Sequence, residues 1–272
     1  MVDAVLVDGQ PLDAEWLSER AFQFGDGLFE TIAVVDGSPC LWDAHMQRLL
    51  LGCDRLNLPR PEIDALLNDA QQLAAGQQRA VLKVYWTAGH SQRGYARPHP
   101  LVPQRIVSLS TWPYAQAPGD WAVRVCDHRL SENPVLAGIK HLNRLDQVIA
   151  RNESDDPLFQ EGLMLGQDGR VVCGTMSNLF LHTDGRLVTP EIGGAGIDGV
   201  VRQLVLATAK RLRVDIRIGS VTMADVERAD AVYFTNSLIG AVRAARVGDW
   251  VYPSTVETHA VFSEVRRSCH AS

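Results

Sequence analysis

The chain has 272 residues, enough for one large domain or two modest ones. Its 46% hydrophobic and 21% charged residues are typical of a globular protein. Lys and Arg number 26 against 32 Asp and Glu, so the net charge is −6 and no basic surplus exists for nucleic acid or an anionic membrane. The five cysteines show no C-x-x-C spacing, which argues against a disulfide framework and a zinc site.

The sequence gives no sign of a targeting or membrane segment. No charged leader precedes an apolar core at the N-terminus, and no apolar run approaches membrane-spanning length. The histidines outside the motifs below are scattered without metal-ligand spacing. We therefore expect a cytoplasmic protein without a metal site, a membrane partner or a nucleic-acid partner.

The first half of the chain predicts a hairpin followed by two helices and two strands. A β-rich run at 29–35 ends at Asp36-Gly37 and is followed by 39–42, which is typical of a hairpin. Asp43 is predicted to cap a helix that ends at Leu56. The remaining elements predicted here are a helix at 62–75 and strands at 80–87 and 105–111.

Residues 113–119 form the best linker candidate, because they hold two prolines and a glycine. We expect a domain at 1–112, a linker at 113–120 and a larger domain at 121–272. Strands are predicted in the second half at 121–126, 162–165, 171–172, 178–182, 186–189, 214–218 and 231–235, and helices at 143–151, 199–212 and 223–228.

This mixture of hairpin strands and helices predicts an α+β fold rather than a doubly wound parallel sheet. The chain has no G-x-G-x-x-G motif after a strand, so a dinucleotide-binding fold has no support.

Lys140 stands between a small apolar run at 135–139 and the helical pattern at 143–151. A lysine in that position would be partly desolvated, which disfavours its ammonium form and lowers its pKa. An amine needs such a shift to attack a carbonyl and form a Schiff base. The alternative is a surface lysine beside a loop, and position alone favours that alternative.

Two segments could bind a phosphate. The glycine-rich run 193–199 leads directly into the helix at 200–212, whose N-terminus carries a positive partial charge. The alternative for this run is a flexible loop with Asp198 as the helix N-cap. Arg48 shares a helix face with His45 and could clamp a phosphate, although a solvated helix face explains the pair as well.

Two further segments carry polar groups beside strands. Thr235, Asn236 and Ser237 close an apolar strand, where they could meet a ligand or form a turn. The run 24–31 places two glycines around an aspartate between aromatic residues. A hairpin turn would explain those glycines but leaves Glu30, at the start of an apolar run, without a role.

These segments together resemble the fold-type IV pyridoxal-phosphate enzymes, which comprise branched-chain aminotransferases, D-amino-acid aminotransferases and aminodeoxychorismate lyases. The resemblance implies a small N-terminal α/β domain, a larger C-terminal mixed-sheet, barrel-like domain, and a homodimer. It spans nearly the whole chain through six ordered segments: FGDGLFE at 24–30, HMQR at 45–48, GIK at 138–140, SNLF at 177–180, GIDG at 196–199 and TNS at 235–237.

The resemblance also implies roles for single residues. Lys140 would be the Schiff-base lysine of pyridoxal 5'-phosphate. The cofactor phosphate would be held by Arg48, by the backbone of Ile197 and Asp198, and by the hydroxyl of Ser237. The substrate would meet Glu30, Arg93, Tyr95 and Asn236.

Within this family the lyase branch is favoured. The run KHLNRLDQV at 140–148 is similar to the segment after the lysine in aminodeoxychorismate lyases, and Arg93-Gly94-Tyr95 matches their R-G-Y. The expected reaction converts 4-amino-4-deoxychorismate to 4-aminobenzoate and pyruvate, with Arg93 meeting a substrate carboxylate and Thr31 or Tyr95 as candidate proton donors. The alternative is a D-amino-acid or branched-chain aminotransferase.

Cys173 departs from the family pattern, because it stands where these enzymes have a glutamate that faces the pyridine nitrogen. A thiol is a weak hydrogen-bond partner and only a thiolate would replace the charge. Three explanations for the missing glutamate compete. Cys173 is a thiolate, another carboxylate takes the place of the glutamate, or the ring stays neutral and is a weaker electron sink. We rank the weaker electron sink first. A non-catalytic, cofactor-binding protein is the second alternative.

Overall fold

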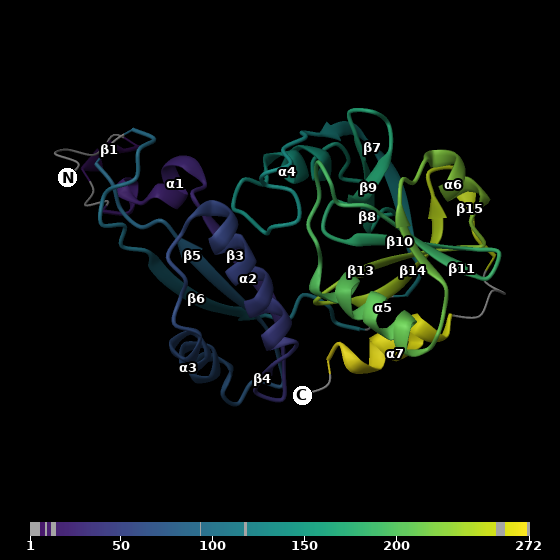
Figure 1. The fold of residues 1–272 in the computed structure, drawn as a ribbon, viewed down its shortest axis with the longest axis horizontal. Helices are drawn as coiled ribbons and strands as arrows, with labels where there is room; N and C mark the ends of the chain where they lie inside the picture. Colours follow the sequence, from purple (N-terminus) through teal and green to yellow (C-terminus); the bar gives the residue numbers. More distant parts are fainter. Residues whose placement is uncertain are drawn as a thin grey trace.

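The structure, a computed structural model, describes residues 6–8, 10–11, 15–92, 94–116, 119–253 and 259–270. Figure 1 shows two lobes, one built on a four-stranded sheet and the other on a nine-stranded sheet. Mixed strand directions and packed helices confirm the predicted α+β class. The chain leaves the four-stranded sheet at Thr111 and enters the nine-stranded sheet at Trp121, while the exact domain boundaries stay a prediction.

The four-stranded sheet is antiparallel throughout, in the order β4-β3-β5-β6. The predicted hairpin at its edge is confirmed, because Val34 pairs with Pro39 across a turn at Asp36 and Gly37. Both turn residues have positive φ, which suits the tight turn between two strands. The strands are β3 (Gly27–Val35), β4 (Ser38–Pro39), β5 (Arg79–Thr87) and β6 (Gln104–Thr111).

Helices α2 (Trp42–Leu56) and α3 (Ile63–Ala74) cover this sheet. The buried residues of α2 recur at helical spacing and include Leu49 and Cys53, which join the core of this lobe. Asp43 does not cap α2, since the N-cap is Leu41 in a left-handed conformation without a side-chain hydrogen bond. The preceding elements are β1 (Leu6–Val7), β2 (Gln10–Pro11), a 3₁₀ turn at Glu15–Ser18 and α1 (Arg20–Phe24).

The second sheet runs in the order β12-β11-β10-β13-β14-β7-β8-β9, with β15 paired to β14. Three of its pairings are parallel and the others are antiparallel, so the sheet is mixed. Its strands are β7 (Trp121–Leu130), β8 (Glu161–Gly166), β9 (Val171–Gly174), β10 (Asn178–Thr183), β11 (Arg186–Pro190), β12 (Ile216–Gly219), β13 (Ala231–Asn236), β14 (Gly240–Val247) and β15 (Trp250–Val251).

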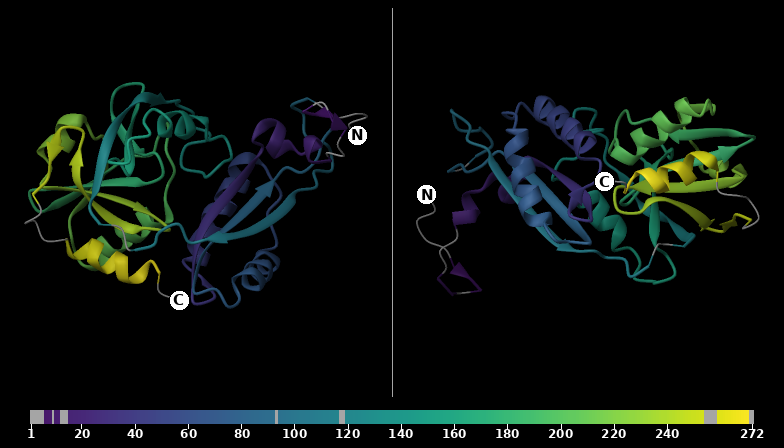
Figure 2. Two further views of the ribbon diagram at one scale, coloured as in Figure 1. Left: turned by 180° about the vertical axis from the view of Figure 1, so that it is seen from behind. Right: turned by 90° about the horizontal axis from the view of Figure 1, so that it is seen from below.

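Helices α5 (Val200–Arg211) and α7 (Ala260–Ser268) lie side by side against β13 and β14, as the right view of Figure 2 also shows. The shorter helices α4 (Leu145–Arg151) and α6 (Met223–Arg228) pack against β7 and β10 respectively. The sequence predicted neither β14, β15 nor α7. Across the described ranges, no helix has both the length and the apolar character needed to cross a membrane.

The segment that carries Lys140 is hydrogen-bonded on two sides. Hydrogen bonds of 3.0 Å join the backbones of residues 140 and 142 to β3. On the other side, Gly138 donates to the carbonyl of Gly196 at 2.9 Å and accepts from the amide of Asp198 at 3.0 Å. Gly138 has a φ of +87°, which a residue with a side chain rarely adopts. The backbone beside Lys140 is therefore fixed between the two lobes.

Candidate active site

A cavity of about 490 Å³ opens between the lobes. Its wall combines residues of β3 and α2 with the segment around Lys140, the β9–β10 connection, the start of α5 and the end of β13. The structure brings together at this cavity most of the residues expected to bind the cofactor. Those that line it are Arg48, Lys140, Cys173, Ile197 and Ser237, together with Asn236.

Lys140 is half-buried, with its Nζ 4.2 Å from the centre of the Phe29 ring. Burial lowers the pKa of Lys140 to about 7, helped by the cation of Arg48 and opposed by the carboxylate of Glu30. A large share of this amine is therefore uncharged at neutral pH. An uncharged amine at a cavity wall is able to act as a nucleophile.

Arg48 reaches the cavity from α2 and is held from behind by a buried carboxylate. Its Nε and Nη2 donate to Glu30 at 2.9 and 2.5 Å, and its Nη1 donates to the carbonyl of Asp198 at 3.1 Å. A guanidinium has five N–H groups, so two remain without a partner among the described residues. Arg48 can offer these to an anion in the cavity.

Glu30 was expected to contact the substrate, but it is fully buried and does not line the cavity. Burial raises the pKa of the Glu30 carboxyl, but the charge and hydrogen bonds of Arg48 lower it more. A hydrogen bond of 2.6 Å between His45 Nδ1 and Glu30 Oε2 lowers it further, and the resulting pKa of Glu30 is about 2. Burial also lowers the pKa of His45. Glu30 is thus an anion that fixes Arg48.

The N-terminus of α5 faces the cavity through Val200 and Val201. The first N–H groups of a helix have no partner within it and carry a positive partial charge. Asn178 braces the preceding loop: its amide donates to the carbonyl of Ile197 at 2.8 Å and its oxygen accepts from Gly199 N at 3.1 Å. A Cβ on Gly199 would lie 2.1 Å from that oxygen, so any side chain there would displace the Asn178 amide.

Asp198 is not the N-cap of α5, because that position belongs to Gly199. The carboxylate of Asp198 instead accepts hydrogen bonds of 2.7–2.8 Å from Arg202 and Gln203, within the first turn of the helix. Its backbone carbonyl accepts from Arg48, as described above. Asp198 therefore joins α2 to α5 at the cavity edge.

Ser237 and Asn236 end β13 at the cavity wall. The hydroxyl of Ser237 donates to the carbonyl of Thr31 at 2.6 Å, which links the two lobes. Asn236 accepts from the amides of residues 238 and 239 at 2.9 and 3.0 Å and thereby closes a turn. The sequence left open whether these residues form a turn or meet a ligand; in the structure they both form a turn and line the cavity.

Cys173 lines the cavity from β9 and is buried. Burial raises the pKa of its thiol to about 12, and the nearby carboxylate of Glu161 adds to the effect. At neutral pH this thiol is protonated in the structure. Cys173 therefore offers the cavity an uncharged and weak hydrogen-bonding group.

Glu161 was not singled out from the sequence, yet it is a fully buried carboxylate beside the cavity wall. Its oxygens accept hydrogen bonds from Thr175 N at 3.0 Å, from Thr175 Oγ1 at 2.5 Å and from Ser177 Oγ at 2.6 Å. These bonds hold the turn between β9 and β10. The carboxylate is occupied by that turn and does not line the cavity.

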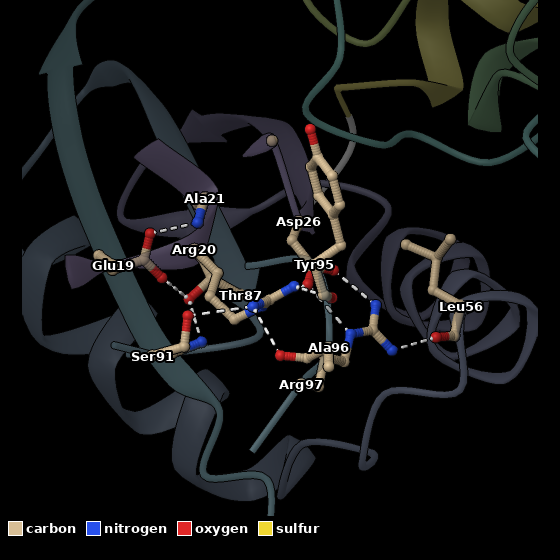
Figure 3. Close-up of polar contacts among 12 residues, drawn as sticks. Glu19, Arg20, Ala21, Asp26, Leu56, Thr87, Ser91, Tyr95, Ala96 and Arg97 are labelled. Atoms are coloured by element: carbon tan, nitrogen blue, oxygen red, sulfur yellow. Dashed lines mark hydrogen bonds and ion pairs between the residues drawn. The ribbon is translucent and has the colours of Figure 1, made fainter. Parts of the chain in front are cut away.

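Tyr95 is 87% exposed and does not line the cavity of its own chain, and Arg93 lies outside the described residues. The loop that carries Tyr95 is held by the buried side chain of Arg20, which donates to the carbonyls of residues 94–96 at 2.8–3.3 Å (Figure 3). Asp26 accepts from both Arg20 and Arg97, at 2.8 and 2.5 Å. A rigid network thus presents Tyr95 to the outside.

The other residues that line the cavity include Thr31, Tyr114, Arg144 and Arg151. Of these, the sequence pointed only to Thr31. Tyr114 falls in the stretch expected to be a linker, and burial raises the pKa of its hydroxyl. Arg144 belongs to the run 140–148 that the sequence singled out, but no role was assigned to its side chain.

The amino-transferase class IV family model matches residues 27–247, and the chain belongs to this family. The aminodeoxychorismate lyase of Vibrio harveyi is 32% identical over 86% of this chain and 88% of that protein. The crystal structure of 4-amino-4-deoxychorismate lyase from Pseudomonas aeruginosa is 38% identical, with a TM-score of 0.88 over 98% of this chain and 99% of the other. A hypothetical aminotransferase from Mycobacterium tuberculosis, in its PLP-bound form, is 22% identical with a TM-score of 0.80 over 98% of both chains, and shares the fold.

Proposed function

We propose that this protein is a pyridoxal-phosphate-dependent aminodeoxychorismate lyase, which converts 4-amino-4-deoxychorismate to 4-aminobenzoate and pyruvate, a step of folate biosynthesis. The observation that carries the proposal is its likeness, over nearly the whole of both chains, to a lyase of this name. The cavity chemistry agrees with that reaction, because a reactive amine and an anion-binding wall meet in one place.

The residues at the cavity fit the cofactor. The neutral amine of Lys140 suits an aldehyde, and the two N–H groups of Arg48 that have no partner among the described residues suit a phosphate. The open N–H groups of α5 lie on the same wall, between Ile197 and Val201. Pyridoxal phosphate bound there would supply an aldehyde that captures amines and a ring that withdraws electrons from the neighbouring carbon.

Lys140 has two tasks in this proposal. Its Nζ would hold the cofactor aldehyde, and its amine, when free, would take the proton from the amine-bearing ring carbon of the substrate. Loss of the enolpyruvyl group leaves an aromatic ring, which favours the forward direction. The leaving oxygen needs a proton, and the hydroxyls at this cavity are those of Thr31 and Tyr114, besides the serine and threonine residues of its rim.

Binding of the substrate carboxylates is proposed to involve Asn236 at the cavity and the loop of Arg93 and Tyr95. Because Tyr95 is exposed and does not line the cavity of its own chain, we propose that this segment serves the cavity of a second copy in a homodimer. The proposed environment is the cytoplasm, without nucleic-acid or membrane partners.

Two alternatives within the same fold keep the cofactor but change the outcome. A D-amino-acid or branched-chain aminotransferase would use the same lysine with a keto acid as amino acceptor. A catalytically impaired, cofactor-binding protein is favoured only by Cys173, whose protonated thiol provides no charge for the ring nitrogen.

One assay separates these functions. Purified protein loaded with pyridoxal phosphate is given 4-amino-4-deoxychorismate without any keto acid, and pyruvate is followed with lactate dehydrogenase. We expect pyruvate and 4-aminobenzoate in equal amounts. A requirement for a keto acid would establish the aminotransferase, and no turnover with bound cofactor would establish the impaired protein.

A further inference from the structure

Helix α4 presents one face to the cavity that holds Lys140. The residues of this face recur at positions i, i+3, i+4, i+7 and i+8, which lie on the same side of a helix: Arg144, Gln147, Val148, Arg151 and Asn152. Arg144 is the N-cap and Asn152 the C-cap, so the whole length of α4 borders the cavity. At a rise of 1.5 Å per residue, the two arginines lie about 10 Å apart along the helix axis. We call this face the α4 wall.

The lining of this cavity carries more positive charge than a phosphate requires. Four cationic side chains border it, and none of the described lining residues is an aspartate or a glutamate. The whole chain has a net charge of −6, so this excess of cations is local. Arg48 and the N-terminus of α5 are assigned to the cofactor phosphate, and Lys140 to its aldehyde. Arg144 and Arg151, on the α4 wall, are therefore left for another anion.

Arg151 has most of its hydrogen-bonding capacity unused. Its Nη1 donates to the carbonyl of Gln160 at 2.9 Å, which ties the guanidinium to the residue before β8. Among the described residues, its other four N–H groups have no partner and no carboxylate forms an ion pair with it. Its charge acts on the cavity lining: burial raises the pKa of the Tyr114 hydroxyl, the carboxylate of Glu161 raises it further, and the cation of Arg151 lowers it. Arg151 is exposed, so a ligand can reach it.

The charge of Arg144 acts on residues at the other end of the α4 wall. Burial lowers the pKa of Lys140 to about 7 and raises that of Cys173 to about 12, and the cation of Arg144 lowers both. Its Nε is fully buried and its Nη2 contacts Nε2 of His141, so neither is open to a ligand. Its Nη1 has no hydrogen-bond partner in the described part of the chain and is not fully buried. Nη1 is thus the part of Arg144 that can meet an anion.

We propose that the α4 wall selects a dicarboxylate substrate, with Arg144 meeting the carboxylate beside the reacting carbon and Arg151 the carboxylate at the far end. The identity of the substrate rests on the proposed function, in which the amine of 4-amino-4-deoxychorismate joins the cofactor. One carboxylate of this compound belongs to the enolpyruvyl group next to the amine-bearing carbon, and the other lies on the ring carbon opposite the amine. Hydrogen bonds from a guanidinium to a carboxylate are about twice as strong as neutral ones. These contacts add to the one proposed for Asn236.

Binding of chorismate tests this proposal without turnover, because chorismate carries both carboxylates but has a hydroxyl in place of the amine. It is titrated calorimetrically into the cofactor-loaded protein, so that the phosphate site is already occupied. We expect Arg151→Met to weaken chorismate binding about tenfold, which corresponds to the loss of a charged hydrogen bond. Arg228→Met changes an exposed arginine of α6 that does not line the cavity, and this matched control should bind chorismate like the unmodified protein.

The ligand 4-hydroxybenzoate separates the two arginines, since it has only the ring carboxylate. Arg151→Met should weaken its binding about tenfold as well. Arg144→Met should weaken the binding of chorismate and leave that of 4-hydroxybenzoate unchanged. Because Arg144 is partly buried, the visible absorbance of the bound cofactor is used to show that Arg144→Met keeps its fold.

Full chorismate affinity in Arg151→Met or in folded Arg144→Met would overturn the proposal, as would the absence of chorismate binding to the unmodified protein. An equal loss of affinity in Arg228→Met would mean general attraction by positive charge and would overturn it too. The lyase assay is independent of these titrations. Pyruvate release with chorismate binding that does not depend on Arg151 rejects the α4 wall alone. Chorismate binding that depends on Arg151, without pyruvate release, rejects the lyase and leaves a dicarboxylate site.

Discussion

The guanidinium of Arg48 donates hydrogen bonds to both carboxylate oxygens of Glu30, with N–O distances of 2.9 and 2.5 Å. Glu30 is fully buried, whereas Arg48 extends to the cavity wall. The buried carboxylate on β3 therefore fixes the orientation of the guanidinium on α2. Any anion bound by Arg48 depends on this support from behind.

Removing the carboxylate should weaken both the fold and the site. We expect Glu30→Gln to lower the free energy of unfolding by about 3 kcal/mol, because it leaves the buried side of Arg48 without its anion. Affinity for pyridoxal phosphate should fall in parallel. Urea unfolding and a cofactor titration measure the two effects. Glu62→Gln, at the exposed start of α3, is the matched control and should change neither.

Glu30 should also make the protein sensitive to acid. Its folded pKa of about 2 lies below its ordinary value of 4.5, so the ionised form stabilises the fold above about pH 4.5. That stabilisation is lost as the pH falls from 4.5 towards 2. Urea unfolding between pH 6 and pH 3 should show a smaller loss of stability in Glu30→Gln than in the unmodified protein. Equal losses would show that Glu30 does not titrate as described.

The lowered pKa of Lys140 predicts how cofactor uptake depends on pH. Only the neutral amine attacks the aldehyde, and its fraction rises as the pH passes through about 7. We expect the rate of visible absorbance change, after pyridoxal phosphate is mixed with cofactor-free protein, to rise up to about pH 8 and then level off. A midpoint near pH 10 would mean an ordinary, solvated lysine.

The close contact between Gly199 and Asn178 predicts a strong effect of a single methyl group. In Gly199→Ala the new Cβ would lie 2.1 Å from Asn178 Oδ1, which must displace the brace of the α5 N-terminus. We expect affinity for pyridoxal phosphate to drop about tenfold, the effect of one weakened phosphate contact. Gly193→Ala is the control, since a Cβ there meets nothing within 4 Å. Equal affinities of the two variants for pyridoxal phosphate would mean that this loop does not bind the phosphate.

Cys173 offers a gain of function. A glutamate at this position can hold a proton on the pyridine nitrogen, which the protonated thiol does not. We expect Cys173→Glu to raise the rate of pyruvate release about tenfold, equal to about 1.4 kcal/mol of the barrier. Cys126→Ala, a buried cysteine of the same core that does not line the cavity, should leave the rate unchanged. An unchanged rate in Cys173→Glu would mean that another group serves the ring nitrogen.

Local sequence signals predicted much of the fold, because turns and helix faces depend on neighbours in the chain. The turn at Asp36 and Gly37 and the apolar face of α2 are examples. β14 escaped prediction, since its Ala, Val and Arg residues lack alternation, and its neighbours β13 and β7 bury it. Its strand character comes from tertiary pairing rather than from local preference.

The candidate site was predicted in its composition but not in its supporting contacts. Lys140 and Arg48 stand in recognisable segments and meet at one cavity. The burial of Glu30 and the brace from Asn178 join residues far apart in sequence, so no local pattern contains them. Arg144 and His141 stand in a run that the sequence singled out, but the contact between their side chains became visible only in the structure.

Covalent labelling of Lys140 tests the central claim most directly. The sequence holds three lysines, Lys83, Lys140 and Lys210, so peptide mapping after borohydride reduction of the cofactor-loaded protein can assign the label without ambiguity. We predict one pyridoxyl group per chain, on the peptide with Lys140, and none in Lys140→Ala. Label on Lys83 or Lys210, or no label in a protein that retains the cofactor, would contradict it.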